Sequence, residues 1–274
     1  MFSHDFMRHA YLAGTFIALA AGLVGYFVVL RNQVFAGDAL SHVAFTGALA
    51  AAVVGASPSA GLFVSTIVVA VVIAGLGGRA RGRDVVIGTI YSWVLGLGAL
   101  FLTLYTTSAS ASNGRIGITV LFGSIYGLSR FQATIAAVIG LATSVAACVI
   151  ARPLLFSSLD EGVAAARGVP VRVLGTAFLV LLGITVAESA QAVGALLIFG
   201  LMVTPAATAQ LLTNRPFRAL GLAAGLSVLE LWVGLALSYA IDRLPPSFAI
   251  VGLAFVAYVA VLAVTRSRRR RAPA

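Results

Sequence analysis

Nine long apolar stretches, separated by short polar connections, occupy most of this chain of 274 residues. A helix needs about 20 apolar residues to cross the hydrocarbon core of a bilayer. The stretches cover residues 10–30, 39–56, 60–78, 85–105, 132–150, 173–187, 192–212, 220–241 and 248–264. Because 61% of the residues are hydrophobic and only 9% are charged, a water-soluble fold could not cover its surface. The sequence therefore predicts one all-α transmembrane bundle over residues 1–274, embedded in a lipid bilayer.

Helices are favoured over strands because the stretches are apolar on all sides and do not alternate in polarity. The stretch 173–187 is short and 39–56 is rich in alanine and glycine, so eight spans is the alternative count. The segment 116–124 is too short to span, and we expect it to be re-entrant or interfacial. Cys148 lies in an apolar stretch, where we expect a small buried side chain.

The arginines predict the orientation, since cytoplasmic loops are enriched in basic residues. With the N-terminus outside and nine spans, the outer side keeps four arginines, namely Arg8, Arg115, Arg130 and Arg243. The other 14 of the 18 then lie inside, including the run 268–271 near the C-terminus. We therefore expect an outer N-terminus and a cytoplasmic C-terminus in a cell membrane.

All 18 lysine-plus-arginine residues are arginines. A phosphate-binding P-loop needs a lysine, so any ATP that drives this chain must be bound by another one. The net charge of +10 comes from arginines in short loops between apolar runs. That pattern is typical of the cytoplasmic face of a membrane protein, and it predicts no nucleic-acid partner.

Asp38 and His42 are spaced four residues apart, so on a helix they share one face. A carboxylate and an imidazole suit zinc or manganese ions, and ionisable residues in membranes are usually functional. The alternative is that Asp38 caps a helix and His42 only bonds a neighbouring helix. A second cluster, His4, Asp5 and His9, lies in the N-terminal tail, where we expect no fixed metal geometry.

Five further residues are candidates for the lining of a pathway. Glu230 lies midway along its span, where it either lines a pathway or bonds a neighbouring helix. Glu188 and Gln191 close the sixth stretch at its outer end, as part of an outer mouth or, the reading we favour, as a solvated helix end. Thr204 and Pro205 lie in the middle of the seventh stretch, where a proline kinks or breaks a helix and frees a carbonyl.

Taken together, these segments resemble the membrane permease subunits of the zinc, manganese and iron ABC importers. The most specific is GDALSH at residues 37–42, within a longer match over 28–43. The other matching segments are 6–14, 121–125, 191–198 and 204–209. The departures are local: Asn32 stands where a second arginine is usual, and Thr46-Gly47 where Pro-Gly is common.

The resemblance implies a homodimer with its pathway at the dimer interface, driven by a cytoplasmic ATP-binding subunit and supplied by an extracytoplasmic solute-binding protein. The acid and histidine of the family's motif fall on Asp38 and His42. The segment 160–168 resembles the family's cytoplasmic coupling helix. The family's pattern is matched there by Asp160, Ala164, Ala166 and Gly168, whereas Gly162 stands where a second acid is usual.

The chain is therefore expected to be a permease rather than an enzyme, with a divalent metal ion, zinc or manganese, as cargo and no permanently bound cofactor. One alternative is a proton-coupled secondary transporter that works without an ATPase and uses Glu188 and Glu230 as proton relays. Another is a membrane assembly protein that transports nothing.

Overall fold

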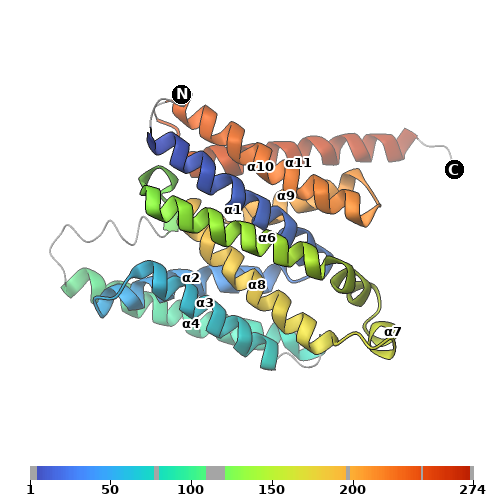
Figure 1. Cartoon of the computed structure of the whole chain (residues 1–274), viewed down its shortest axis with the longest axis horizontal. Helices are drawn as coiled ribbons and strands as arrows, with labels where there is room; N and C mark the ends of the chain where they lie inside the picture. Colours follow the sequence, from blue (N-terminus) through green and yellow to red (C-terminus); the bar gives the residue numbers. More distant parts are fainter. Residues whose placement is uncertain (1–4, 77–79, 109–120, 196–197, 242, 272–274) are drawn as a thin grey trace.

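The computed structural model describes residues 5–76, 80–108, 121–195, 198–241 and 243–271, which are helical apart from short connections and contain no β-strand (Figure 1). The elements are α1 (Asp5–Leu30), α2 (Val34–Val53), α3 (Pro58–Leu76), α4 (Ala80–Ser108), the 3₁₀ turn η1 (Ile125–Gly127), α6 (Arg130–Leu159), α7 (Glu161–Ala166), α8 (Val171–Ala192), α9 (Ile198–Leu212), α10 (Pro216–Ala240) and α11 (Pro246–Arg271). The expectation of an all-helical membrane protein is thereby confirmed.

Eight of the described helices are long and apolar enough to cross a membrane. The expected stretch 192–212 forms the shorter helix α9, because the chain after α8 turns through Gly194, which has a φ of +95°. The stretch 173–187 forms a longer helix than its apolar run suggested, since α8 extends over Val171–Ala192. Residues 116–120 of the expected interfacial segment lie outside the described residues.

The long helices form two groups joined by α8 (Figure 1). In one group, α2 packs against α3 and α4. In the other, α1 packs against α6, α9 and α10, and α11 covers α9 and α10. Because α8 contacts α2 and α3 on one side and α1 and α6 on the other, it lies between the two groups.

Small residues allow the helices to approach closely, as is usual in membrane bundles. Gly22 of α1 lies against the backbone of Ala223 and Ala224 in α10, and a Cβ there would overlap both. On the other side of the bundle, Gly47 of α2 lies equally close to Gly61 of α3. These contacts hold each group together where bulkier residues would force the helices apart.

The bundle turns large apolar side chains outward, as lipid contact requires. Trp93 on α4, Phe131 and Val149 on α6 and Phe255 on α11 are all more than 60% exposed. Cys148 is also exposed, so the expectation that it is buried in the protein was wrong. Its neighbour Val149 is 73% exposed, which shows that this side of α6 faces away from the other helices.

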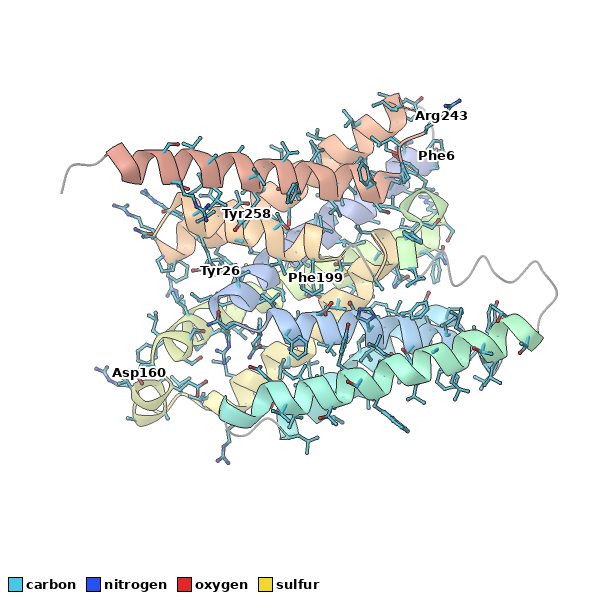
Figure 2. The ribbon with its side chains drawn as sticks, turned by 180° about the vertical axis from the view of Figure 1, so that it is seen from behind. Phe6, Tyr26, Asp160, Phe199, Arg243 and Tyr258 are labelled. Atoms are coloured by element: carbon cyan, nitrogen blue, oxygen red, sulfur yellow. The ribbon has the colours of Figure 1, made fainter. Side chains whose placement is uncertain are left out.

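The two ends of the bundle carry different segments (Figure 1). The η1 end holds the start of α1, η1 and the connection between α10 and α11. The α7 end holds the end of α1, α7 and the end of α11. Figure 2 shows Asp160 at the end opposite to Phe6 and Arg243.

Candidate functional site

The helix that carries Asp38 and His42 is positioned by a tight turn at the α7 end. Three residues, Arg31 to Gln33, connect α1 to α2. Asn32 adopts a φ of +52°, a left-handed conformation that asparagine tolerates better than most residues. The N–H of Gln33 donates to the carbonyl of Val28 over 2.8 Å, which closes the turn. As a result, α2 starts at a defined place and angle relative to α1.

Asp38 and His42 lie one turn apart on the same face of α2, as their spacing predicts. Nε2 of His42 lies 3.9 Å from Oδ1 of Asp38, which is too long for a hydrogen bond. Two donor atoms that bind one metal ion in tetrahedral geometry lie about 3.4 Å apart. The side chains of Asp38 and His42 are 38% and 21% exposed, so both atoms remain accessible from outside the protomer.

An aromatic side chain packs against His42. Its ring makes a T-shaped contact with Tyr91 of α4, at a centroid distance of 5.2 Å and an interplanar angle of 81°. Phe35 packs against the same tyrosine at 6.0 Å. Further along the helix, the hydroxyl of Thr46 donates to the carbonyl of Val94 over 3.1 Å. Sequence reasoning missed Tyr91, because nothing in the sequence near it indicates which helix packs against α2.

Asp38 and His42 of one protomer would make only part of a metal site. Across the described ranges, no group of three or more His, Cys, Asp or Glu side chains could hold an ion. Asp38 and His42 offer one oxygen and one nitrogen ligand, whereas metal sites in proteins usually have at least four positions filled. The remaining ligands of an ion bound here would have to come from water or from another chain.

The segment expected to couple to an ATPase forms the short helix α7 at the end of the bundle (Figure 2). Asp160 caps it, since its side chain accepts a 2.9 Å hydrogen bond from the N–H of Val163. Ala164 is fully buried against the bundle and Ala166 is exposed. Gly168, with a φ of +81°, ends the helix, and its N–H donates to Ala165 over 3.0 Å.

Glu188 and Gln191 lie in a covered part of α8, so the favoured reading of a solvated helix end was wrong. Glu188 is only 1% exposed, because α8 continues past it to Ala192 and packs against both α3 and α6. The carbonyl of Gln191 accepts a 3.2 Å hydrogen bond from the N–H of Ser124. Its side-chain oxygen accepts one of 3.5 Å from Ser59.

Thr204, Pro205 and Glu230 occupy the interior of the second helix group. The helix α9 runs through Pro205 without a break, so of the two expected effects, a kink or a break, the break does not occur. Thr204 bonds within its own helix, with its hydroxyl 3.4 Å from the carbonyl of Phe199. Glu230 is 2% exposed, and neither of its carboxylate oxygens makes a hydrogen bond among the described residues. Asp38 lies in the other helix group, and the part of α9 that lies against its neighbour Gly37 is formed by Phe199 and Met202.

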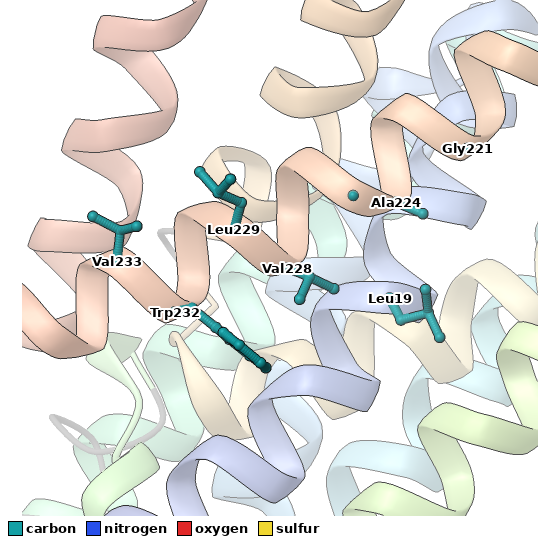
Figure 3. Close-up of a pocket in the computed structure, with 8 residues that line it drawn as sticks. Leu19, Gly221, Ala224, Val228, Leu229, Trp232 and Val233 are labelled. Carbon is teal, nitrogen blue, oxygen red and sulfur yellow. The ribbon is translucent and has the colours of Figure 1, made fainter. Parts of the chain in front are cut away.

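Two hollows on the surface are poorly suited to metal ions. One, of about 440 Å³ at the η1 end, is lined by Asp5 and His9 but also by Arg8 and Arg130, whose positive charges oppose cation binding. His4, the third member of the expected cluster, lies outside the described residues. The other, of about 740 Å³, lies beside α10 and is apolar, with Leu19, Leu229 and Trp232 in its lining (Figure 3).

Comparisons with known proteins agree with this architecture. The ABC 3 transport family matches residues 3–265. The chain is 30% identical over 243 residues to the manganese transport system membrane protein MntC of Halalkalibacterium halodurans, a match covering 88% of this chain and 82% of that protein. It is 29% identical over 242 residues to the chelated iron transport system membrane protein YfeC of Yersinia pestis, covering 88% and 80%.

A solved structure shows the same fold. PsaBC from Streptococcus pneumoniae in complex with Fab matches with a TM-score of 0.81 and 27% identity, covering 95% of this chain and 92% of the matched chain. The sequence match and the structural match thus each cover nearly the whole chain. The chain therefore belongs to the ABC 3 transport family of multi-pass membrane permeases.

Proposed function

We propose that this permease carries a divalent transition-metal ion, Mn²⁺ or Zn²⁺, into the cytoplasm. The observation that carries the proposal is the pair of Asp38 and His42 on the accessible face of α2. A carboxylate and an imidazole suit both ions. Relatives named for manganese and chelated iron transport support a metal cargo, and they make Mn²⁺ the first ion to test.

A second copy of the chain completes the ion pathway. Asp38 and His42 of one protomer supply two ligands, and the same pair from a partner copy would bring the set to two oxygens and two nitrogens. A homodimer in which the α2 helices face each other meets this need, and closed two-fold symmetry is the commonest form of assembly. Binding has to be weak enough for the ion to leave.

A separate ATP-binding subunit drives transport. As a family permease the chain is a transport component and not an enzyme. It contains no lysine, so it has no P-loop with which to bind ATP. The helix α7 projects at the end of the bundle and exposes Glu161 and Ala166, which makes it the docking surface that such a subunit needs.

The α7 end is the cytoplasmic end in this proposal. It is the end to which nine spans assign 14 of the 18 arginines, in line with the enrichment of basic residues in cytoplasmic loops. The N-terminus and η1 then lie outside. A solute-binding protein delivers the ion there, and ATP-driven movement of α7 exposes Asp38 and His42 alternately to the two sides.

Uptake measurements test the proposal. The permease is reconstituted in liposomes with its ATP-binding subunit, and uptake of radioactive Mn²⁺ is followed with and without ATP. We expect Asp38→Ala and His42→Ala to abolish uptake and to leave assembly with the ATP-binding subunit intact. Asp84→Ala and His9→Ala, which remove the same groups away from α2, serve as controls. Uptake at the wild-type rate by both α2 variants would rule out the proposed pathway, and so would ATP-independent uptake in a pH gradient.

A further inference from the structure

Arg31, the first residue after α1, holds its guanidinium group among three other helices. Its Nη1 atom donates to the hydroxyls of Ser157 and Ser158 in the last turn of α6, over 3.2 and 3.1 Å. Both serines donate their own hydrogens to the carbonyl of Leu154, so their oxygens are free to accept from arginine. The side chain of Arg31 is only 7% exposed, which shields these bonds from competing water.

The same guanidinium group reaches α7 and α8. Its Nη2 atom lies 3.8 Å from the carboxylate of Glu161, the first residue of α7. Its central carbon lies 5.8 Å from the centre of the Phe178 ring in α8, within the range of a cation–π contact. The ion pair alone is weak, because Glu161 is 67% exposed. Two serine hydroxyls, an aromatic ring and a carboxylate thus surround one guanidinium group. An arginine fits this site, because its planar group makes several directed contacts at once.

Along the chain, Arg31 is directly connected to α2, the helix that carries Asp38 and His42. Only Asn32 and Gln33 separate it from the first residue of α2, and Gln33 is 5% exposed. The N–H of Gly37 donates to the carbonyl of Gln33 over 3.1 Å, which continues the helical hydrogen bonding up to the residue before Asp38. Asp38 lies about 7.5 Å along the helix axis from Gln33.

We propose that Arg31 is a positioning residue that links α7 to α2, so that movement of α7 is passed to Asp38 and His42. The inference rests on the proposed function, in which the ATP-binding subunit moves α7. Separating the guanidinium from the two serines would leave a positive charge covered by protein without its acceptors, which is costly. The α1–α2 turn, the end of α6 and the start of α7 therefore move as one unit.

A distance measurement tests whether these segments move together. Spin labels are placed at Val34→Cys in α2 and Ala165→Cys in α7, two exposed positions, in a Cys148→Ala background. Labelled protomers are diluted with unlabelled ones in the complex with the ATP-binding subunit, and the separation is measured without nucleotide and after trapping with ATP and vanadate. We expect the same narrow distribution in both states with Arg31, and a broader, nucleotide-dependent one with Arg31→Lys.

A second measurement follows the consequence for transport. Arg31→Lys keeps the charge but loses the planar guanidinium group that bonds the two serines. The ratio of Mn²⁺ transported to ATP hydrolysed should therefore fall about tenfold, within the usual range of coupling between sites. The double variant Ser157→Ala and Ser158→Ala should show the same loss, and adding Arg31→Lys to it should cause little more. Arg152→Lys, at an exposed position of the same α6, is the matched control and should retain the wild-type ratio.

The outcomes separate this link from the proposed function. A label separation that changes with nucleotide in the wild-type chain refutes the link, whichever ion is transported. An unchanged distribution in Arg31→Lys refutes it as well. If the wild-type complex transports no Mn²⁺, the proposed cargo is wrong. The distance between the spin labels still tests the link between α7 and α2. Equal losses of ATP hydrolysis and transport in Arg31→Lys would indicate a purely structural role and overturn the inference.

Discussion

The hydroxyl of Ser227 in α10 donates a 2.6 Å hydrogen bond to the main-chain carbonyl of Leu201 in α9. Leu201 lies four residues before Pro205, whose ring nitrogen carries no hydrogen for that carbonyl. Both partners are fully buried, where a carbonyl without a donor would be costly. A serine from the neighbouring helix thus replaces the missing helical donor, which explains how α9 continues through its proline.

Ser227→Ala should therefore destabilise the protein. The substitution leaves the Leu201 carbonyl without a donor, so we expect a loss of about 1–3 kcal/mol in the free energy of unfolding. Thermal unfolding of the purified protein in detergent measures the effect. Ser92→Ala is the control, because the Ser92 hydroxyl bonds within its own helix on an exposed face of α4. Equal stability of the two variants would mean that the Leu201 carbonyl finds another donor.

Glu230→Gln should be tolerated or should stabilise the protein. The carboxylate is 2% exposed and has no hydrogen-bond partner among the residues described, and an amide costs less to bury than a charged carboxylate. The thermal midpoint should stay equal or rise, and ATP-driven Mn²⁺ uptake should remain. Loss of uptake in both Glu230→Gln and Glu188→Gln, with folding intact, would favour the proton-relay alternative instead.

Gly168→Val should weaken the link to the ATP-binding subunit. A Cβ at Gly168 would meet open space, so the difficulty lies in its φ of +81°. A β-branched residue in this conformation costs about 1–3 kcal/mol, and the chain after α7 would relax to a different path. ATP hydrolysed per ion transported should rise. Gly175→Val, in α8 without a positive φ or a close neighbour, should leave this ratio unchanged.

Gly22→Val should disrupt the packing of α1 on α10. A Cβ at Gly22 would overlap the backbone of Ala223 and Ala224, so α1 would have to move at a cost of about 1–3 kcal/mol or more. Gly221→Val, on the apolar groove of α10 shown in Figure 3, meets nothing within 4 Å and should fold normally. Size-exclusion profiles after stepwise heating distinguish the two. Similar profiles would contradict the tight contact between α1 and α10.

The sequence predicted the helical membrane fold because runs of apolar residues long enough to cross a bilayer leave few alternatives. It also placed Asp38 and His42 on one face, since residues four apart are neighbours on the surface of any helix, whatever packs around it. The burial of Glu188 and the partners of Arg31 were not predicted. Both depend on which helices pack together, and uniformly apolar helices carry no periodic pattern that identifies their neighbours.

The division of the ligands has a consequence for how a cargo ion would be released. Each protomer brings one carboxylate and one imidazole, 3.9 Å apart and open to the outside of the bundle. In the proposed dimer, affinity then depends on the gap between the two copies of α2. A slight widening of that gap would divide a site with four ligands into two sites with two ligands each, and both would bind the ion weakly. The ion would be let go by the same movement that opens its exit.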